Sequence, residues 1–185
     1  MSAKDEFIQI FNENIGREGS GDFLNWLEST DFFTAPASTR YHSCHEGGLC
    51  EHSLNVYHRL TALATEPINL ATNETIAICG LLHDVCKANF YKATTRNVKN
   101  EQTGQWEKQP YYSIEEKFPF GHGEKSVFLI ERFMTLTPEE AVAIRFHMGE
   151  FEKERSTSDA YSKYPLAVML HIADEEATFL DEKEE

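Results

Sequence analysis

Histidine and aspartate residues recur along this chain on helical faces that they share with apolar residues. They are His52, the pair His83-Asp84, His122, His147 and Asp174. Neutral imidazole nitrogens and ionised carboxylate oxygens are good ligands for divalent transition metals. Buried without partners, the same groups would each cost several kcal/mol in desolvation. One cation held among several helices would satisfy them together, so the pattern predicts a metal site inside a helical bundle.

The His83-Asp84 pair follows the apolar run 76–82, which is too hydrophobic for a surface segment. On a helix that continues to Lys87, the residues His83, Asp84 and Lys87 share one face. Two ligands and a cation would then point into whatever the helix packs against. A single His-Asp pair is more often a hydrogen-bonded core histidine beside a helix-terminal aspartate. The metal interpretation therefore depends on the whole set of residues.

The spacing of apolar residues predicts the helices that position these side chains. His52 lies on the apolar stripe of a helix expected at 49–65, and His122 opens another helix. Thr137 and Glu140 form a capping box around Pro138, which starts the helix that leads to His147. Asp174 lies on the apolar face of the last helix. The stretch 150–163 before that helix is predicted to be a polar loop.

Residues 90–120 carry the β signal of the chain. Turn residues at 100–104 are flanked by β-branched and aromatic stretches, which predicts a β-hairpin insertion around residues 92–118. Everything else favours helices, so the expected fold class is all-α. We expect one domain over 1–185, with an N-terminal helical cover at 1–30 and a metal-binding core at 40–180.

Composition limits the function classes. The net charge is −14, with 31 acidic and 17 basic residues, which argues against binding to long nucleic acid. The first residues lack a signal sequence and no apolar run reaches 18 residues, so we expect no membrane association. The four cysteines form no CxxC pair. Reduced thiols and a cytoplasmic location are therefore expected.

Distinctive local motifs surround the candidate ligands. They are Gly47-Gly48-Leu49-Cys50-Glu51-His52, Leu82-His83-Asp84-Val85-Cys86-Lys87, Gly121-His122, His147-Met148-Gly149 and Leu170-His171-Ile172-Ala173-Asp174. In this order, over about 40–180, they resemble the HD-domain metal-dependent phosphohydrolases. The local sequence of these motifs is similar to that of the HD module of bacterial 3′–5′ exoribonucleases. The resemblance implies an HD-domain helical bundle.

The resemblance also implies a role for each matching residue. The core metal ligands would be His52, His83, Asp84 and Asp174, with Asp84 able to bridge two ions. His122 and His147 would bind a second ion or contact phosphate. Lys87 would stabilise phosphoryl oxygens, which makes Asp84 and Lys87 the catalytic candidates. The chain departs from the family at Cys86, where glycine is common, and a thiol there would crowd the site or make it redox-sensitive.

The predicted activity is hydrolysis of a phosphomonoester or phosphodiester, of a nucleotide or a related small phosphoester. One or two ions of Mn, Fe, Ni or Zn suit the ligands best, with Mg possible, and would supply hydroxide from bound water. The substrate would also contact Lys87, His42 and Arg145. Exposed aromatic residues at 106–120 make a homodimer contact conceivable.

Alternatives remain open at this stage. Some HD-domain proteins are di-iron oxygenases, and a third class would be a metal-stabilised, ligand-sensing module without turnover. A separate zinc site at His42, Cys44, His45 and Cys50 is a weaker alternative, because its spacing fits no standard zinc loop.

Overall fold

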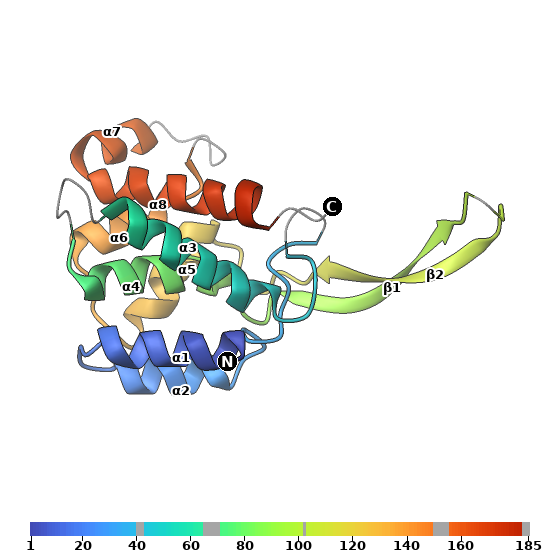
Figure 1. Cartoon of the computed structure of the whole chain (residues 1–185), viewed down its shortest axis with the longest axis horizontal. Coiled ribbons are helices and arrows are strands. Elements are labelled where there is room, and N and C mark those ends of the chain that lie inside the picture. Colours follow the sequence, from blue (N-terminus) through green and yellow to red (C-terminus); the bar gives the residue numbers. More distant parts are fainter. Residues whose placement is uncertain (40–42, 65–70, 102, 150–155, 183–185) are drawn as a thin grey trace.

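The computed structural model describes residues 1–39, 43–64, 71–101, 103–149 and 156–182. Its elements are α1 (Ala3–Asn14), α2 (Ser20–Glu28), α3 (Gly48–Ala64), α4 (Asn73–Leu82), the 3-10 turn η1 (Val85–Lys87), β1 (Tyr91–Lys99), β2 (Trp106–Ile114), α5 (His122–Glu131), α6 (Pro138–Arg145), α7 (Ser156–Lys163), α8 (Pro165–Glu176) and the π-helical turn η3 (Ala177–Asp181). The helices form a bundle in which α3, α4, α5 and α6 lie between the α1–α2 pair and the α7–α8 pair (Figure 1). The predicted helical bundle with a small hairpin is confirmed.

Helices α3 and α4 approach each other closely near the candidate site. A Cβ atom on Gly80 would lie 2.6 Å from the Cα of Tyr57, so glycine is what lets the two helices pack this tightly. The apolar residues 76–82 of α4 are all buried, which anchors the helix in the core. Because α3 carries His52 and α4 leads into His83, this close packing sets the distance between the two imidazoles.

Helix α4 ends close to the His83-Asp84 pair and does not continue to Lys87 as an α-helix. It ends at Leu82 with His83 as its C-cap, and Asp84 leaves the helical conformation with φ −107° and ψ 18°. The 3-10 turn η1 follows and packs against α5. Asp84 and Lys87 therefore face each other across a 3-10 turn and not along a continuous α-helix.

The start of α6 follows the sequence prediction. Thr137 accepts a hydrogen bond from the backbone N–H of Glu140, whose side chain accepts one from the Thr137 N–H, and Pro138 occupies the first turn. This capping box is confirmed. The stretch before α8 is different: the polar loop predicted at 150–163 is wrong for 156–163, which form α7. Ser156 to Lys163 have few apolar residues, so periodicity alone gave no helix signal there.

The aromatic residues of α1 and α2 close one side of the bundle. Phe7, Phe11 and Phe23 are fully buried, and Phe7 meets Phe32 edge-on with ring centroids 5.3 Å apart. Arg17, between the two helices, donates to Glu140 of α6 at 2.8 and 2.9 Å. These contacts hold the first two helices against the helices that carry the candidate ligands.

Strands β1 and β2 form a two-stranded antiparallel hairpin that extends away from the helices (Figure 1). Tyr91 pairs with Ile114 and Lys99 pairs with Trp106, so the hairpin spans 91–114, within the predicted region. It leaves the bundle directly after η1. Within the described residues, no helix is long and apolar enough to cross a membrane. All four cysteines are free thiols.

Candidate metal centre

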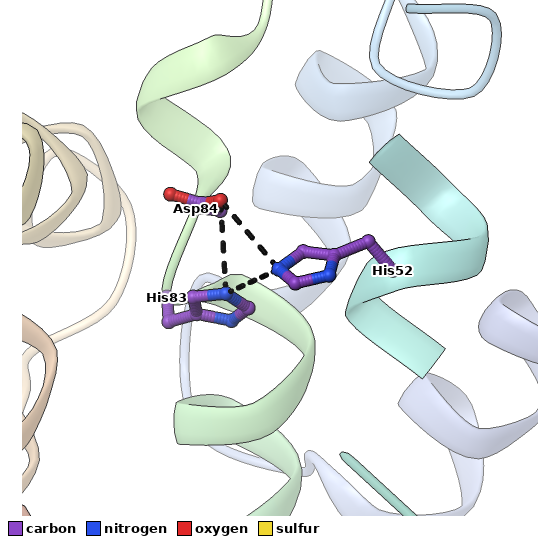
Figure 2. Close-up of side chains that lie close together, drawn as sticks. All are labelled: His52, His83 and Asp84. Atoms are coloured by element: carbon purple, nitrogen blue, oxygen red, sulfur yellow. Dashed lines mark hydrogen bonds and ion pairs between the residues drawn. The ribbon is translucent and has the colours of Figure 1, made fainter. Parts of the chain in front are cut away.

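Three helices bring the first group of candidate ligands together. His52 lies in α3, His83 and Asp84 follow α4, and Asp174 lies in α8. The Nε2 atoms of His52 and His83 are 3.4 Å apart, and Oδ2 of Asp84 lies 3.8 and 3.7 Å from them. Figure 2 shows both rings turned toward each other and toward the Asp84 carboxylate. Oδ1 of Asp174 lies 3.2 Å from Nε2 of His52.

Each buried imidazole is oriented by a hydrogen bond from its other nitrogen. Nδ1 of His83 donates to the Gly80 carbonyl at 2.9 Å, and Nδ1 of His147 donates to the Ile144 carbonyl at 2.7 Å. Nδ1 of His52 donates to a carboxylate oxygen of Glu182 at 2.9 Å. A proton held at Nδ1 leaves the Nε2 lone pair available as a ligand, and metal-binding histidines are typically fixed in this way.

The inward-facing nitrogens fit a bound cation better than they fit each other. Nε2 of His147 is buried and, among the described residues, has no hydrogen-bond partner; Oδ1 of Asp84 is 3.6 Å away. With Nδ1 of both rings already donating, the Nε2 atoms of His52 and His83 face each other across the site. Two nitrogen ligands of one tetrahedral ion lie about 3.3 Å apart, close to the observed 3.4 Å. The donor set therefore fits a divalent transition metal.

The three buried histidines differ in the direction of their pKa shifts. Burial lowers the pKa of His83 to about 4, so this imidazole is neutral at pH 7. Burial also acts against protonation of His52, but hydrogen bonds to Asp174 and Glu182 outweigh it and raise the pKa of His52 to about 9. For His147, the Asp84 carboxylate likewise outweighs burial and raises the pKa. Without a cation, a proton on His52 offsets part of the charge of the carboxylates.

Lys87 is the cation beside this cluster. Its Nζ lies 2.5 Å from Oδ2 of Asp84, and its side chain is 12% exposed. Burial raises the pKa of the Asp84 carboxyl, but Lys87, His83 and His147 together outweigh burial and hold the pKa well below its usual range. Burial lowers the pKa of Lys87 in turn, and Asp84 raises it above its ordinary value. Both groups are charged at neutral pH.

The remaining candidate ligands fall into two further groups of potential ligand atoms. One combines His83, His147 and Asp174, and the other combines Asp84, Cys86 and His122; within each group the atoms lie within 4.8 Å of one another. The structure thus brings all six predicted ligands into one connected cluster. His122 and His147 fall in different groups, whereas the resemblance gave both the role of binding a second ion or contacting phosphate. That any of these residues binds metal remains a prediction.

The predicted substrate contacts differ in their surroundings. Lys87 adjoins the cluster, whereas Arg145 forms an ion pair with Glu124 and lies over the Phe146 ring at 4.7 Å. His42 lies outside the described residues. The alternative zinc site is not seen among Cys44, His45 and Cys50, which form no metal-binding group in the described part of the chain.

Glu182 is a residue that sequence reasoning missed. Its side chain is 4% exposed and accepts hydrogen bonds from His52, from Asn55 at 3.0 Å and from Ser43 at 2.8 Å. Burial raises the pKa of this carboxyl, and these bonds lower it overall, so Glu182 is ionised at neutral pH. An ionised partner at Nδ1 makes Nε2 of His52 a stronger ligand. The two partners lie 130 residues apart, so no local sequence pattern indicates this contact.

Replacing Glu182 with alanine is expected to weaken metal binding by about 10–100-fold, because His52 loses the acceptor that fixes its ring and its tautomer. Glu182→Gln keeps an acceptor of the same shape and should lose less. Competition with a chromophoric chelator measures the affinity. Asp181→Asn is the matched control, because Asp181 pairs with Arg59 at the surface and does not contact His52. Equal affinity in wild type and Glu182→Ala would contradict the role.

Comparison with known proteins agrees with this geometry. Residues 49–178 match the family model of the HD domain, a segment that begins beside the first candidate ligand and ends beyond the last. No curated protein and no solved structure matches the chain. The family match covers well over half of the chain and includes every residue of the donor cluster. The chain therefore belongs to the HD-domain superfamily of metal-dependent phosphohydrolases.

Proposed function

We propose that this protein hydrolyses a phosphomonoester or phosphodiester of a nucleotide or a related small phosphoester, in a metal-dependent reaction. The observation that carries the proposal is Lys87, a partly exposed cation 2.5 Å from the carboxylate that joins the ligand groups. A positive charge fixed beside a metal site suits the stabilisation of developing charge on phosphoryl oxygens.

The residues that would hold the metal are His52, His83, Asp84 and Asp174, with His147 and His122 beside them. When bound, a divalent cation supplies Lewis-acid activation of water and of the phosphoryl group. The three anchored imidazoles direct Nε2 into the cluster, and the two carboxylates supply negative charge. Mixed nitrogen and carboxylate donors favour Mn²⁺, Fe²⁺, Ni²⁺ or Zn²⁺ over Ca²⁺, with Mg²⁺ a poorer fit.

The exposed edge of the cluster indicates where substrate would enter. His52, His83 and His147 are fully buried, whereas the side chains of Lys87 and Asp174 are 12% and 15% exposed. A phosphoryl group that enters at this edge meets the Lys87 ammonium first. Lys87 then orients the phosphoryl oxygens while Asp84 fixes the position of the ammonium. The buried imidazoles behind them exclude bulk water from the reacting groups.

Small substrates are favoured by the overall charge of −14, which would repel long polyanions. Arg145 is a weaker candidate than Lys87 for a phosphate contact, because its ion pair with Glu124 engages its charge.

Metal analysis with a substrate panel tests the proposal. Purified protein would be analysed for bound metal, stripped with chelator, reloaded with Mn²⁺, Fe²⁺ or Zn²⁺, and assayed against nucleoside monophosphates, cyclic nucleotides and sugar phosphates. Phosphate release that requires reloading is expected. Bound metal without hydrolysis of any phosphoester would favour the oxygenase or sensor alternatives. The absence of bound metal would contradict the proposal, because the proposed reaction requires a metal ion.

We also propose that the hairpin contacts a second copy of the chain. Residues 91–114 contain four basic and two acidic residues, in a chain that is otherwise strongly acidic. Trp106 and Ile114 are 70% and 60% exposed, and an isolated two-stranded hairpin is only marginally stable in water. A basic, aromatic arm complements the acidic surface of another helical bundle, which would supply its missing contacts.

Reversing charge on the hairpin with the pair Arg96→Glu and Lys99→Glu is expected to convert a dimer into a monomer, because like charges would then meet across the contact. Light scattering at low ionic strength measures the mass, and added salt should weaken the wild-type dimer. Lys163→Glu on α7 is the control. A wild type that is monomeric at all concentrations would exclude this contact.

A further inference from the structure

The Asp84 carboxylate faces two different sets of donors. Oδ2 points toward His52 and His83, whereas Oδ1 lies 3.8 Å from Sγ of Cys86. That sulfur lies 3.4 Å from Nδ1 of His122. An oxygen, a sulfur and a nitrogen thus converge at Oδ1 of Asp84, which also lies 3.6 Å from Nε2 of His147.

This second set of donors is held by packing between η1 and α5. The backbone N–H of Cys86 donates to Oγ of Ser126 at 3.1 Å, which places the start of η1 against the first turns of α5. Behind His122, a Cβ on Gly123 would lie 2.2 Å from the Arg145 carbonyl oxygen, so glycine lets α5 sit close to α6. Cys86 is 1% exposed and His122 is half-buried, so the thiol faces the histidine and not solvent.

The distances suit ligands of one ion. With a metal–sulfur bond of about 2.3 Å and a metal–nitrogen bond of about 2.0–2.1 Å, tetrahedral ligands lie about 3.6 Å apart, close to the observed 3.4 Å between Cys86 and His122. A thiol that coordinates a metal loses its proton outright. Binding would form a metal–sulfur bond and release that proton to solvent. Thiolate is a soft ligand, which favours Zn²⁺, Fe²⁺ or Co²⁺ and disfavours Mg²⁺.

We propose that Cys86 supplies a thiolate ligand to the second metal position that the family resemblance implies beside Asp84 and His122, and that this thiolate makes the position select a thiophilic divalent ion. Cys86 then acts as a ligand at the position where the family commonly has glycine. The proposal goes beyond hydrolysis, because it concerns which metal is bound and does not depend on which phosphoester is cleaved.

Cobalt substitution tests the site, because thiolate bound to Co²⁺ gives a charge-transfer absorption band in the near ultraviolet that nitrogen and oxygen ligands do not give. Chelator-stripped protein would be titrated with Co²⁺ alone and followed by absorption and by bound metal per chain. Wild type is expected to bind two ions and to develop the thiolate band. Cys86→Ser is expected to bind one ion without the band. His122→Asn should weaken the same ion selectively and reduce the band.

Cys79→Ser is the matched control, because Cys79 is a fully buried thiol in α4 outside the ligand groups. It should keep both ions and the band, and circular dichroism of each metal-free variant checks that it folds. One bound ion without a thiolate band in wild type would overturn this inference and leave the His52–His83 position intact. A band that survives Cys86→Ser would also overturn it. No bound cobalt at all would overturn both this site and the metal centre of the proposed function.

Discussion

Replacing Asp84 with asparagine is expected to remove bound metal and to lower phosphate release by about 10³-fold or more, the equivalent of several kcal/mol of transition-state stabilisation. The reason is the position of this carboxylate. Its two oxygens face separate ligand groups, and Lys87 lies 2.5 Å from one of them. An amide keeps the shape of the side chain but not its charge. Elemental analysis and a phosphate-release assay measure the two losses.

The Asp84→Asn variant must be shown to fold, because Lys87 would keep its charge in a largely buried position without its partner. Removing one member of a buried ion pair typically costs about 3–5 kcal/mol. Thermal unfolding of metal-free protein measures this cost, and His83→Gln provides a second variant that leaves the Asp84–Lys87 pair in place. Asp22→Asn, on the exposed face of α2, is the control. A folded Asp84→Asn protein that retains metal and activity would exclude Asp84 as a ligand.

Lys87→Met is expected to lower kcat/KM by about 10²–10³-fold, as removal of one transition-state donor does elsewhere, while metal binding is retained. Methionine preserves most of the side-chain volume and removes the ammonium. The metal-free variant should also unfold at a lower temperature, because Asp84 is left as a buried carboxylate without its lysine partner. Added metal should restore most of that stability, because a divalent ion supplies the missing positive charge. Steady-state kinetics and thermal unfolding with and without metal check both effects.

Lys125→Met is the matched control for Lys87→Met. The Lys125 side chain is 11% exposed and pairs with Glu116 at 2.9 Å, so it resembles Lys87 in burial and pairing. It lies over the Phe90 ring and outside the ligand groups. Its loss should lower stability without a metal-dependent recovery and should leave kcat/KM within a few-fold of wild type. Equal kinetic losses in the two variants would contradict the special role of Lys87.

The sequence by itself determined the helical class, the hairpin insertion and the inward faces that carry histidine and aspartate. Periodicity reports which side chains share a face, so His52 and Asp174 could be placed on buried stripes without coordinates. The capping box at Thr137 could be predicted for a similar reason, since it involves residues three apart. The ordered set of motifs around the candidate ligands identified the family, and the match over residues 49–178 bears this out.

Tertiary structure alone decided which candidate ligands lie in one group and which side chains hydrogen-bond to those ligands. Glu182 contacts His52 across 130 residues, and Cys86 meets His122 across 36. Helix α4 stops at Leu82, so a 3-10 turn and not a helical face places Lys87 beside Asp84. Helical periodicity describes one element at a time, whereas these contacts depend on how α3, α5 and η3 pack in space. Long-range packing carries no local sequence pattern, which is why only the folded chain reveals them.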